Sequence, residues 1–199
     1  MDPAIAHLAH LVELLRAGGI VACPTETLQG LLADALSDPA VQAVVTLKRR
    51  GPDPIALLLP SIDALGMVAT SCADAALALA ERHWPGPLTL LVEARPELPR
   101  ALVRDGKVGV RVPGPSPALA LVRAFAGPLT ATSANLSGHP AARTAAEVRG
   151  YFPQGLAAQV EGDAPGGLPS TVIDASQDTA RVIRIGAIEI PDTFVATKN

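Results

Sequence analysis

Apolar residues along the chain follow two alternating periods, and this alternation predicts interleaved helices and strands. Ile5, Leu8, Val12 and Leu15 recur at helical spacing in a segment that Asp2-Pro3 would start. Short, wholly apolar runs bounded by Gly or Pro are typical of buried strands. We expect helices at residues 2–17, 39–47, 74–82, 116–126 and from 144, and strands at 20–23, 55–59, 88–92, 108–112, 129–132, 159–160, 170–174 and 180–185.

Local signals refine these elements. The run Ile55–Leu59 contains no polar residue, so it is expected to be covered on both faces. Ser71-Cys72-Ala73-Asp74 and Thr144-Ala145-Ala146-Glu147 both match a capping box, which predicts a helix start at each. His83–Pro87 should break the helix before it. Residues 28–35 fit neither period.

The order of these elements predicts one domain of the α/β class. No linker, composition shift or internal repeat interrupts the alternation, so a single twisted, mixed sheet is the simplest arrangement. We expect the domain over residues 1–190 and a C-terminal tail over 191–199. Two strands run directly into polar loops, Pro24–Thr27 and Ser133–Gly138, which is the usual placement of binding residues in such folds.

Composition narrows the functional classes. Hydrophobic residues make up 49% and charged residues 18%, which argues for a compact core. Aromatic residues are only 3%, and the net charge is −3, so extensive nucleic-acid binding by base stacking is disfavoured. The two cysteines lie far apart and give neither a disulfide framework nor a zinc spacing. With no secretory leader pattern and no run of membrane-spanning length, we expect a cytoplasmic protein without membrane contact.

Lys48-Arg49-Arg50 is the only place where three cations stand together. It follows a predicted helix, so its simplest local interpretation is a solvated helix C-terminus, where cations offset the helix dipole. The alternative is a site for an anion that relieves the repulsion between like charges. The local sequence alone favours the solvated helix end.

The chain contains neither a P-loop nor a glycine-rich dinucleotide fingerprint, so any phosphate would have to bind to side-chain cations and loop amides. Lys107, Arg111 and Arg184 lie in or beside predicted strands. An arginine in a short apolar strand can simply point to solvent. Its coincidence with Lys48 and Arg50 favours an anion site, because the guanidinium fork suits carboxylates and phosphates.

Other candidate chemistry is weaker. The cysteines have no histidine nearby in sequence and are expected to be small buried thiols. The four histidines show no ligand spacing, and His7 and His10 are expected to be exposed. Ser133 does not lie in a hydrolase nucleophile motif. Glu26 fits a general base or an ordinary loop carboxylate, and the sequence does not separate the two.

Seven segments occur in the order found in the YrdC/TsaC family, which the chain resembles over roughly residues 10 to 188. They are Gly19–Thr27, Leu47–Arg50 (the K-x-R pattern), Trp84–Leu90, Val108–Pro113, Ser133–Gly138, Ser170–Asp174 and Arg184–Ile188. Each motif alone is weak, whereas the ordered set is specific. The resemblance implies a twisted α/β fold with a large concave, cationic cavity, in its single-domain form.

The resemblance also implies an activity. Members of the family join L-threonine, bicarbonate or CO₂, and ATP into threonylcarbamoyl-AMP with release of pyrophosphate, a nucleotidyltransferase reaction. The product passes to tRNA-modifying transferase proteins that make threonylcarbamoyladenosine. Mg²⁺ is expected with ATP, because it commonly neutralises a triphosphate. No metal ligand is assigned to the protein.

Carried over residue by residue, the resemblance implies roles for nine positions. Lys48 and Arg50 would hold ATP phosphates and carry catalysis, and Lys107, Asn135 and Arg184 would lie along the nucleotide. The residues expected around threonine and the carbamate are Thr25, Arg111, Ser133 and Ser170. Replacing Lys48 or Arg50 by alanine is expected to weaken ATP use without unfolding, as at an exposed position.

The sequence departs from the family pattern at two places. Leu28-Gln29-Gly30 replaces Val-Tyr-Gly, which removes an aromatic residue, and Leu57–Leu59 lacks the histidine found in many members. These departures leave one alternative open, and the cationic concavity that the resemblance implies leaves another. The chain could be a divergent paralogue with another acyl acceptor or with carbamoyl-AMP chemistry, or an RNA-binding module in translation or ribosome biogenesis. Contact with double-stranded RNA or tRNA would then be weak and electrostatic.

Overall fold

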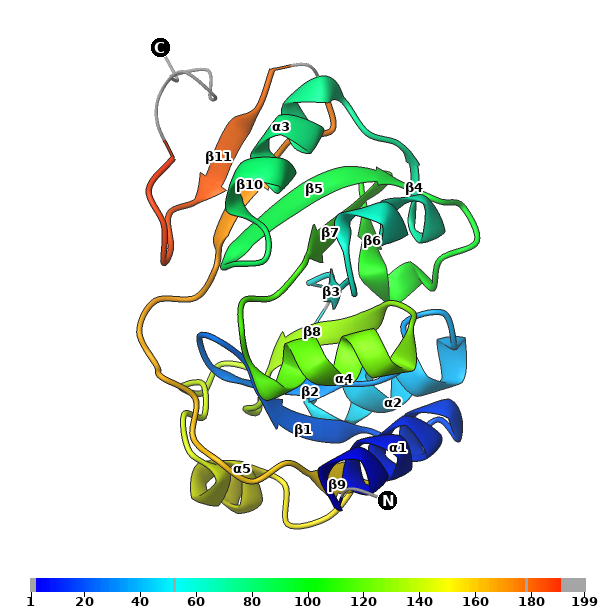
Figure 1. Cartoon of the computed structure of the whole chain (residues 1–199), viewed down its shortest axis with the longest axis vertical. Coiled ribbons are helices and arrows are strands. Elements are labelled where there is room, and N and C mark those ends of the chain that lie inside the picture. The colour runs from blue at the N-terminus through cyan, green and yellow to red at the C-terminus, as the bar shows by residue number, and fades with distance from the viewer. Residues whose placement is uncertain (1–2, 52, 178, 191–199) are drawn as a thin grey trace.

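A mixed sheet runs the length of the molecule, with helices packed along it (Figure 1). The computed structural model describes residues 3–51, 53–177 and 179–190. Its strands are β1 Val21–Pro24, β2 Gln29–Leu32, β3 Ala56–Leu58, β4 Ala69–Ser71, β5 Leu88–Ala94, β6 Val103–Arg104, β7 Lys107–Arg111, β8 Leu129–Ser133, β9 Ala158–Gln159, β10 Thr171–Asp174 and β11 Arg181–Arg184. Its helices are α1 Pro3–Arg16, α2 Asp38–Leu47, α3 Asp74–His83, α4 Pro117–Phe125 and α5 Ala145–Tyr151, with short 3₁₀ helices η1 Ile62–Met67 and η2 Arg100–Leu102.

The strand order is β11-β10-β5-β7-β3-β8-β2-β1-β9, with β4 added to β5 and β6 to β7. The pairs β1/β9, β3/β7 and β5/β10 are parallel, and the other strand pairs are antiparallel. The sheet is therefore mixed, which confirms the predicted α/β class. The residues expected to form the tail, 191–199, lie outside the described residues, as does Asp2 of the expected first helix cap.

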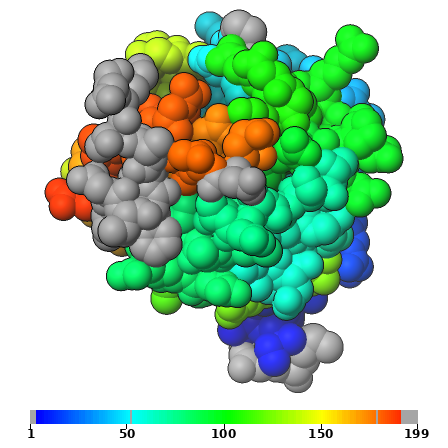
Figure 2. Space-filling model, turned by 90° about the horizontal axis from the view of Figure 1, so that it is seen from above, coloured from blue at the N-terminus to red at the C-terminus, as the bar shows by residue number. Residues whose placement is uncertain are grey.

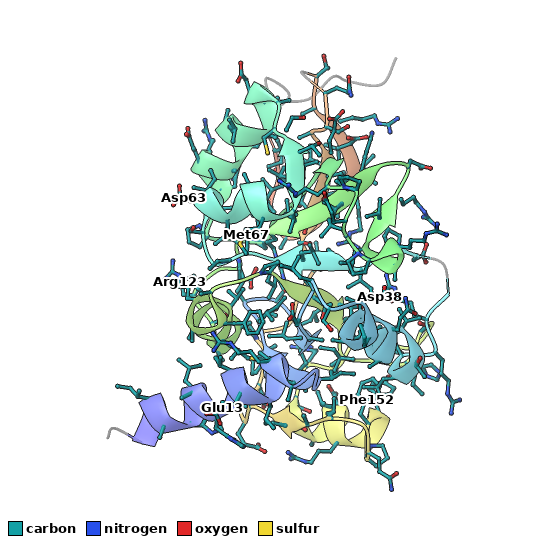
Figure 3. All side chains as sticks on the ribbon, turned by 90° about the vertical axis from the view of Figure 1, so that its right-hand side faces the viewer. Glu13, Asp38, Asp63, Met67, Arg123 and Phe152 are labelled. Carbon is teal, nitrogen blue, oxygen red and sulfur yellow. The ribbon has the colours of Figure 1, made fainter. Side chains whose placement is uncertain are left out.

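Helices lie on both sides of this sheet. In the view of Figure 3, Asp63 of η1 and Arg123 of α4 lie on one side, and Asp38 of α2 lies on the other. At the end of the molecule seen in Figure 2, β10 and β11 lie beside α3 and β5. The sheet is thus bracketed by helices, and strands distant in sequence meet in its middle.

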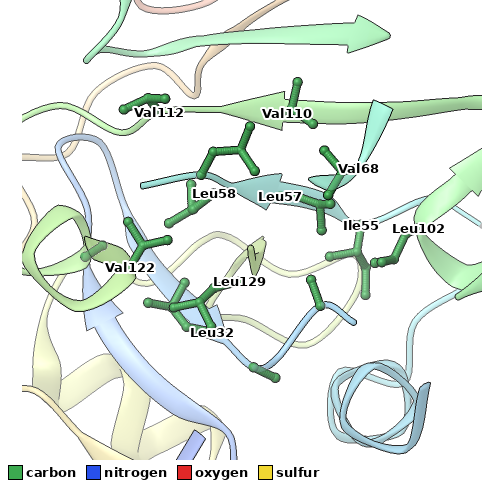
Figure 4. Packing of buried hydrophobic residues seen from close by; sticks show 14 of the residues in the cluster. Leu32, Ile55, Leu57, Leu58, Val68, Leu102, Val110, Val112, Val122 and Leu129 are labelled. Carbon is green, nitrogen blue, oxygen red and sulfur yellow. The ribbon is translucent and has the colours of Figure 1, made fainter. Parts of the chain in front are cut away.

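The core is centred on β3, the strand expected to be covered on both faces. Leu57 and Leu58 are fully buried, and β3 pairs in parallel with β7 and antiparallel with β8 (Figure 4). Val110 and Leu129 on those neighbours are also fully buried. Each such side chain contributes about 1.5–3 kcal/mol of burial free energy, so this aliphatic cluster stabilises the middle of the sheet without aromatic residues.

The two predicted capping boxes had different outcomes. Thr144 and Glu147 form the reciprocal box at the start of α5, as predicted. The box at Ser71 is wrong: α3 is capped by Ala73 without a side-chain bond, and Ser71 lies in β4. The Ser71 hydroxyl donates to the Glu93 carboxylate at 2.9 Å instead, because strand pairing places the two side by side. The ambiguous segment after residue 28 forms β2.

Candidate functional site

A cavity of about 690 Å³ opens among the ends of the central strands. Among the described residues, six basic side chains and three carboxylates line it. The basic ones are Arg50, Arg104, Lys107, Arg111, Arg181 and Arg184, and the acidic ones are Asp53, Asp105 and Asp174. Six hydroxyl groups also face it, from Thr25, Thr27, Thr89, Thr132, Ser133 and Ser170. Seven of the nine predicted site residues thus meet in one cavity, and Lys48 and Asn135 stand outside its lining.

Lys48 is not a solvated helix end. It caps α2, and only 1% of it is exposed. Its ammonium donates to the backbone oxygen of Ser133, to that of Asn135 at 2.8 Å and to the Asn135 side-chain oxygen at 3.2 Å. The Lys48 carbonyl accepts from the Ser137 amide at 3.0 Å. Lys48 therefore fixes the loop of residues 133–139, which we call the 133–139 loop, from behind the cavity wall.

The next two cations diverge from Lys48. Arg49 has φ 50° and is exposed, so it keeps the solvated role. Arg50 turns back to the cavity, where its guanidinium donates to the carbonyls of Asp53 at 2.7 Å and Pro54 at 2.8 Å and to the Thr132 hydroxyl at 3.2 Å. Burial lowers the pKa of Arg50, although the Asp53 carboxylate opposes that shift.

Asn135 organises the 133–139 loop with its own side chain. The amide nitrogen donates to the carbonyls of Leu136 at 2.9 Å and His139 at 2.7 Å. Its oxygen accepts from the Ser133 hydroxyl at 2.5 Å as well as from Lys48. These bonds keep Ser133 at the end of β8, where it lines the cavity.

Arg111 ends β7 inside the cavity and is buried, which excludes the solvent-facing alternative. Its Nη1 lies 3.1 Å from the Glu26 carboxylate. Burial lowers the pKa of Arg111, the Glu26 carboxylate raises it, and the positive charge of Arg184 lowers it. The guanidiniums of Arg111 and Arg184 are thus close enough to affect each other, and both residues line the cavity. The Glu26 carboxylate pairs with Arg111, the more buried of the two.

Arg184 and Ser170 form a second polar group in the cavity lining. Arg184 donates to the Ser170 carbonyl at 2.9 Å and lies 3.4 Å from its hydroxyl, and burial lowers the Arg184 pKa. The Ser170 and Thr89 hydroxyls are 2.9 Å apart. Thr25 is held in its turn by hydrogen bonds with residues 27 and 28. The polar loops predicted at the strand ends therefore converge.

Sequence reasoning predicted Lys107 but missed Asp174 and Arg181, which form a charged cluster with it in the cavity lining. Asp174 accepts from Lys107 at 2.7 Å and from Ser176, and Arg181 lies 3.8 Å away. Burial alone would raise the pKa of Asp174, but the hydrogen bonds from Lys107 and Ser176 outweigh it and lower the pKa. Asp174 ends one predicted strand and Arg181 lies near the start of the next, and these positions were the only local signal available.

The remaining candidates have structural placements. Cys23 is buried, and burial raises its pKa to about 12, which fits a packed, unreactive thiol. Cys72 is half-buried, and His7 and His10 are exposed as expected. Within the described residues, no group of three or more His, Cys, Asp or Glu side chains could hold a metal ion. In the same residues, no helix is both long and apolar enough to cross a bilayer.

The buried ammonium of Lys48 gives a pH prediction. Burial, and then the charge of Arg50, lowers its pKa to about 8, whereas an unfolded chain should show about 10.4. Between these values the unfolded state binds the extra proton, so this group's contribution to stability should increase as pH rises from 8 to 10. The free energy of unfolding, measured with denaturant for the wild type and for Lys48→Met at each pH, should show that increase as a growing difference between the two proteins. A difference that falls or stays flat over this range would contradict the lowered pKa.

Comparisons with known proteins agree with this geometry. A family model for Sua5/yciO/yrdC, described as telomere recombination, matches residues 13–186. A Pyrococcus abyssi protein named threonylcarbamoyl-AMP synthase is 39% identical over 129 residues, covering 64% of this chain and 38% of that protein. A protein of the same name from Alkalilimnicola ehrlichii is 43% identical over 132 residues. The match covers 65% of this chain and 68% of that protein.

A solved structure extends the match to the fold. The crystal structure of P. abyssi Sua5 complexed with L-threonine has a TM-score of 0.83 at 33% identity, covering 90% of this chain and 54% of that one. The chain therefore spans little more than half of that structure, and about two fifths of the length of the P. abyssi relative. Because the family model spans most of the chain and the fold agrees, the chain belongs to the Sua5/YciO/YrdC family.

Proposed function

We propose that the chain is an L-threonylcarbamoyl-AMP synthase, a nucleotidyltransferase that uses ATP, L-threonine and bicarbonate or CO₂ and releases pyrophosphate. One observation carries this proposal. Seven of the nine predicted site residues line one cavity in a fold that matches a Sua5 structure complexed with L-threonine. We further propose that residues 1–190 act as one YrdC-like unit, in the cytoplasm.

The cavity suits three anionic reactants. Arg111 would bind the α-carboxylate of threonine through its free guanidinium edge, and Ser170 and Thr25 would lie beside it. Arg50 and Arg184 would neutralise the phosphates of ATP, with Lys107 at the nucleotide end. The amine of threonine adds CO₂ to give a carbamate, whose oxygen attacks the α-phosphate while pyrophosphate leaves. Positioning and charge stabilisation would supply most of the rate, without a covalent protein intermediate.

Lys48 and Asn135 would act on the nucleotide through the 133–139 loop. Their polar atoms are already used inside that loop and are absent from the cavity lining. We therefore propose that they hold Ser133 against the reacting groups. The described residues contain no group of three or more His, Cys, Asp or Glu side chains that could hold a metal ion by themselves. We therefore assign no residue to Mg²⁺, which would arrive on the phosphates of ATP.

The direct test is incubation of the purified chain with ATP, L-threonine, bicarbonate and Mg²⁺. We expect pyrophosphate release that requires both threonine and bicarbonate, and a product with the mass of threonylcarbamoyl-AMP. Omitting threonine is the matched control. Pyrophosphate release that is independent of threonine, or absent, would refute the proposal. We propose that the product then passes to tRNA-modifying transferases.

A second candidate keeps the nucleotide site but changes the acceptor. Leu58 is fully buried on the cavity wall, in the stretch without the histidine of many relatives. Gln29 replaces the usual aromatic residue, and its amide donates to the Gly162 carbonyl at 2.8 Å. Substituting other amino acids or carbamoyl phosphate in the same assay separates the candidates, because a strict preference for threonine rejects the second. An RNA-binding role is a weaker proposal, and its binding should fade steeply with salt.

A further inference from the structure

Glu26 is a buried carboxylate to which the proposed reaction gives no task. It lies in the turn after β1, its side chain is 12% exposed, and it is not among the residues that line the cavity. Among the described residues, neither of its oxygens accepts a hydrogen bond. Its ion pair is with Arg111, 3.1 Å away. A carboxylate so poorly satisfied is costly, so its presence points to a purpose.

Glu26 lies outside the cavity lining, whereas its partner Arg111 is part of that lining. Both carboxylate oxygens of Glu26 are buried. A general base must come within hydrogen-bond reach of the proton that it takes, directly or through one water. Glu26 can therefore act on the reaction only through Arg111.

Arg111 needs such a partner. It is almost fully buried, and the charge of Arg184 acts on it from within the same cavity. A buried cation without an opposite charge beside it strongly destabilises the fold, and a second cation nearby adds to that cost. The ion pair uses Nη1, and Arg111 also lines the cavity, so the rest of the guanidinium is available to a ligand.

The chain also packs Glu26 tightly from the other side. A Cβ added at Gly114 would lie 3.0 Å from the Cγ and 3.2 Å from the Cβ of Glu26, which is closer than ordinary contact. The loop after β7 thus packs against the Glu26 side chain and restricts its movement. Both the carboxylate and the arginine that it holds are therefore confined to one arrangement.

From this geometry we propose that Glu26 is the positioning residue of Arg111, which it aims and charge-balances so that the free guanidinium edge receives the substrate carboxylate. This inference rests on the proposed function. It removes Glu26 from the candidates for general base. It also predicts that disturbing Glu26 affects the use of the amino acid more than the use of ATP.

The test compares Glu26→Gln with Glu161→Gln in steady-state kinetics. Glu161 forms an exposed ion pair with Arg149 and makes a matched control. In Glu26→Gln, we expect KM for threonine to rise by about tenfold or more, the loss of one well-placed charged contact. KM for ATP and kcat should change by less than about threefold. An unchanged or lower KM for threonine, or a loss confined to kcat, would overturn the proposal.

A second variant covers the case in which Glu26→Gln does not fold. Gly114→Ala keeps every charge and pushes the Glu26 side chain by a few tenths of an ångström. It should raise KM for threonine in the same selective way, and an equal rise for ATP would overturn the proposal. The wild type serves as the reference: if it shows no threonine-dependent pyrophosphate release, the proposed function fails, whereas an active wild type with unaffected variants refutes only the role of Glu26.

Discussion

Replacing Lys48 by alanine should lower threonine-dependent pyrophosphate release by about two orders of magnitude and destabilise the fold. The change leaves three oxygens of Ser133 and Asn135, in bonds that are buried or partly buried, without their charged donor. Losing charged hydrogen bonds at a fully buried position costs on the order of 3 kcal/mol of unfolding free energy. A shift of the 133–139 loop by about 1 Å would account for the loss of rate. The burial of Lys48 thus corrects the expectation that the fold would be unaffected.

Arg49→Ala is the matched control, because Arg49 is the adjacent cation and is exposed. Its substitution should change the unfolding free energy by less than about 0.5 kcal/mol and leave activity unchanged. Urea unfolding and the pyrophosphate assay, run on both variants, measure the two effects. If Lys48→Ala keeps both wild-type stability and wild-type rate, Lys48 does not anchor the 133–139 loop.

The cluster at residues 48–50 shows where sequence reasoning reaches its limit. The local pattern identified a helix end and three cations, and both are present. It could not predict that Arg49 adopts φ 50°, because the left-handed conformation at a helix end is typical of glycine or asparagine. Lys48 still has helical backbone as the cap of α2, and the chain turns only after it, at Arg49. Three adjacent like charges thus have three different environments: Lys48 is buried, Arg49 is exposed and Arg50 lines the cavity.

Local patterns predicted well wherever the deciding partners were near in sequence. The strand at β3 followed from an unbroken apolar run, and the cap of α5 from residues three apart. The cap at Ser71 failed because its partner, Glu93, lies on another strand. Glu26 was undecided for the same reason: its partner Arg111 is brought to it by the sheet, and no local signal reports that pairing. Contacts between strands that are distant in sequence, rather than residue types, therefore determine which residues belong to the site.

Arg111→Lys should lower kcat/KM for threonine by about 100-fold, although the substitution keeps the positive charge. The guanidinium contacts Glu26 with one edge and lines the cavity as well, so it can serve two anions at once. A lysine ammonium is a compact charge without the planar fork. It would stay with Glu26 and leave the substrate carboxylate without its partner, and losing a buried charged contact of this kind costs about 2–5 kcal/mol.

Steady-state kinetics with varied threonine measure this loss, and Arg123→Lys makes the control. Arg123 is exposed on α4 and does not line the cavity. Figure 3 shows it on the side of the molecule away from Asp38 of α2. It donates weakly to the Pro60 carbonyl at 3.4 Å. That variant should keep wild-type kinetics. The unfolding free energy of Arg111→Lys should fall much less than that of Arg111→Ala, because lysine still neutralises the buried Glu26 carboxylate. A lysine variant with wild-type kcat/KM would show that charge alone suffices, and that the two-edged geometry of Arg111 does not determine threonine binding.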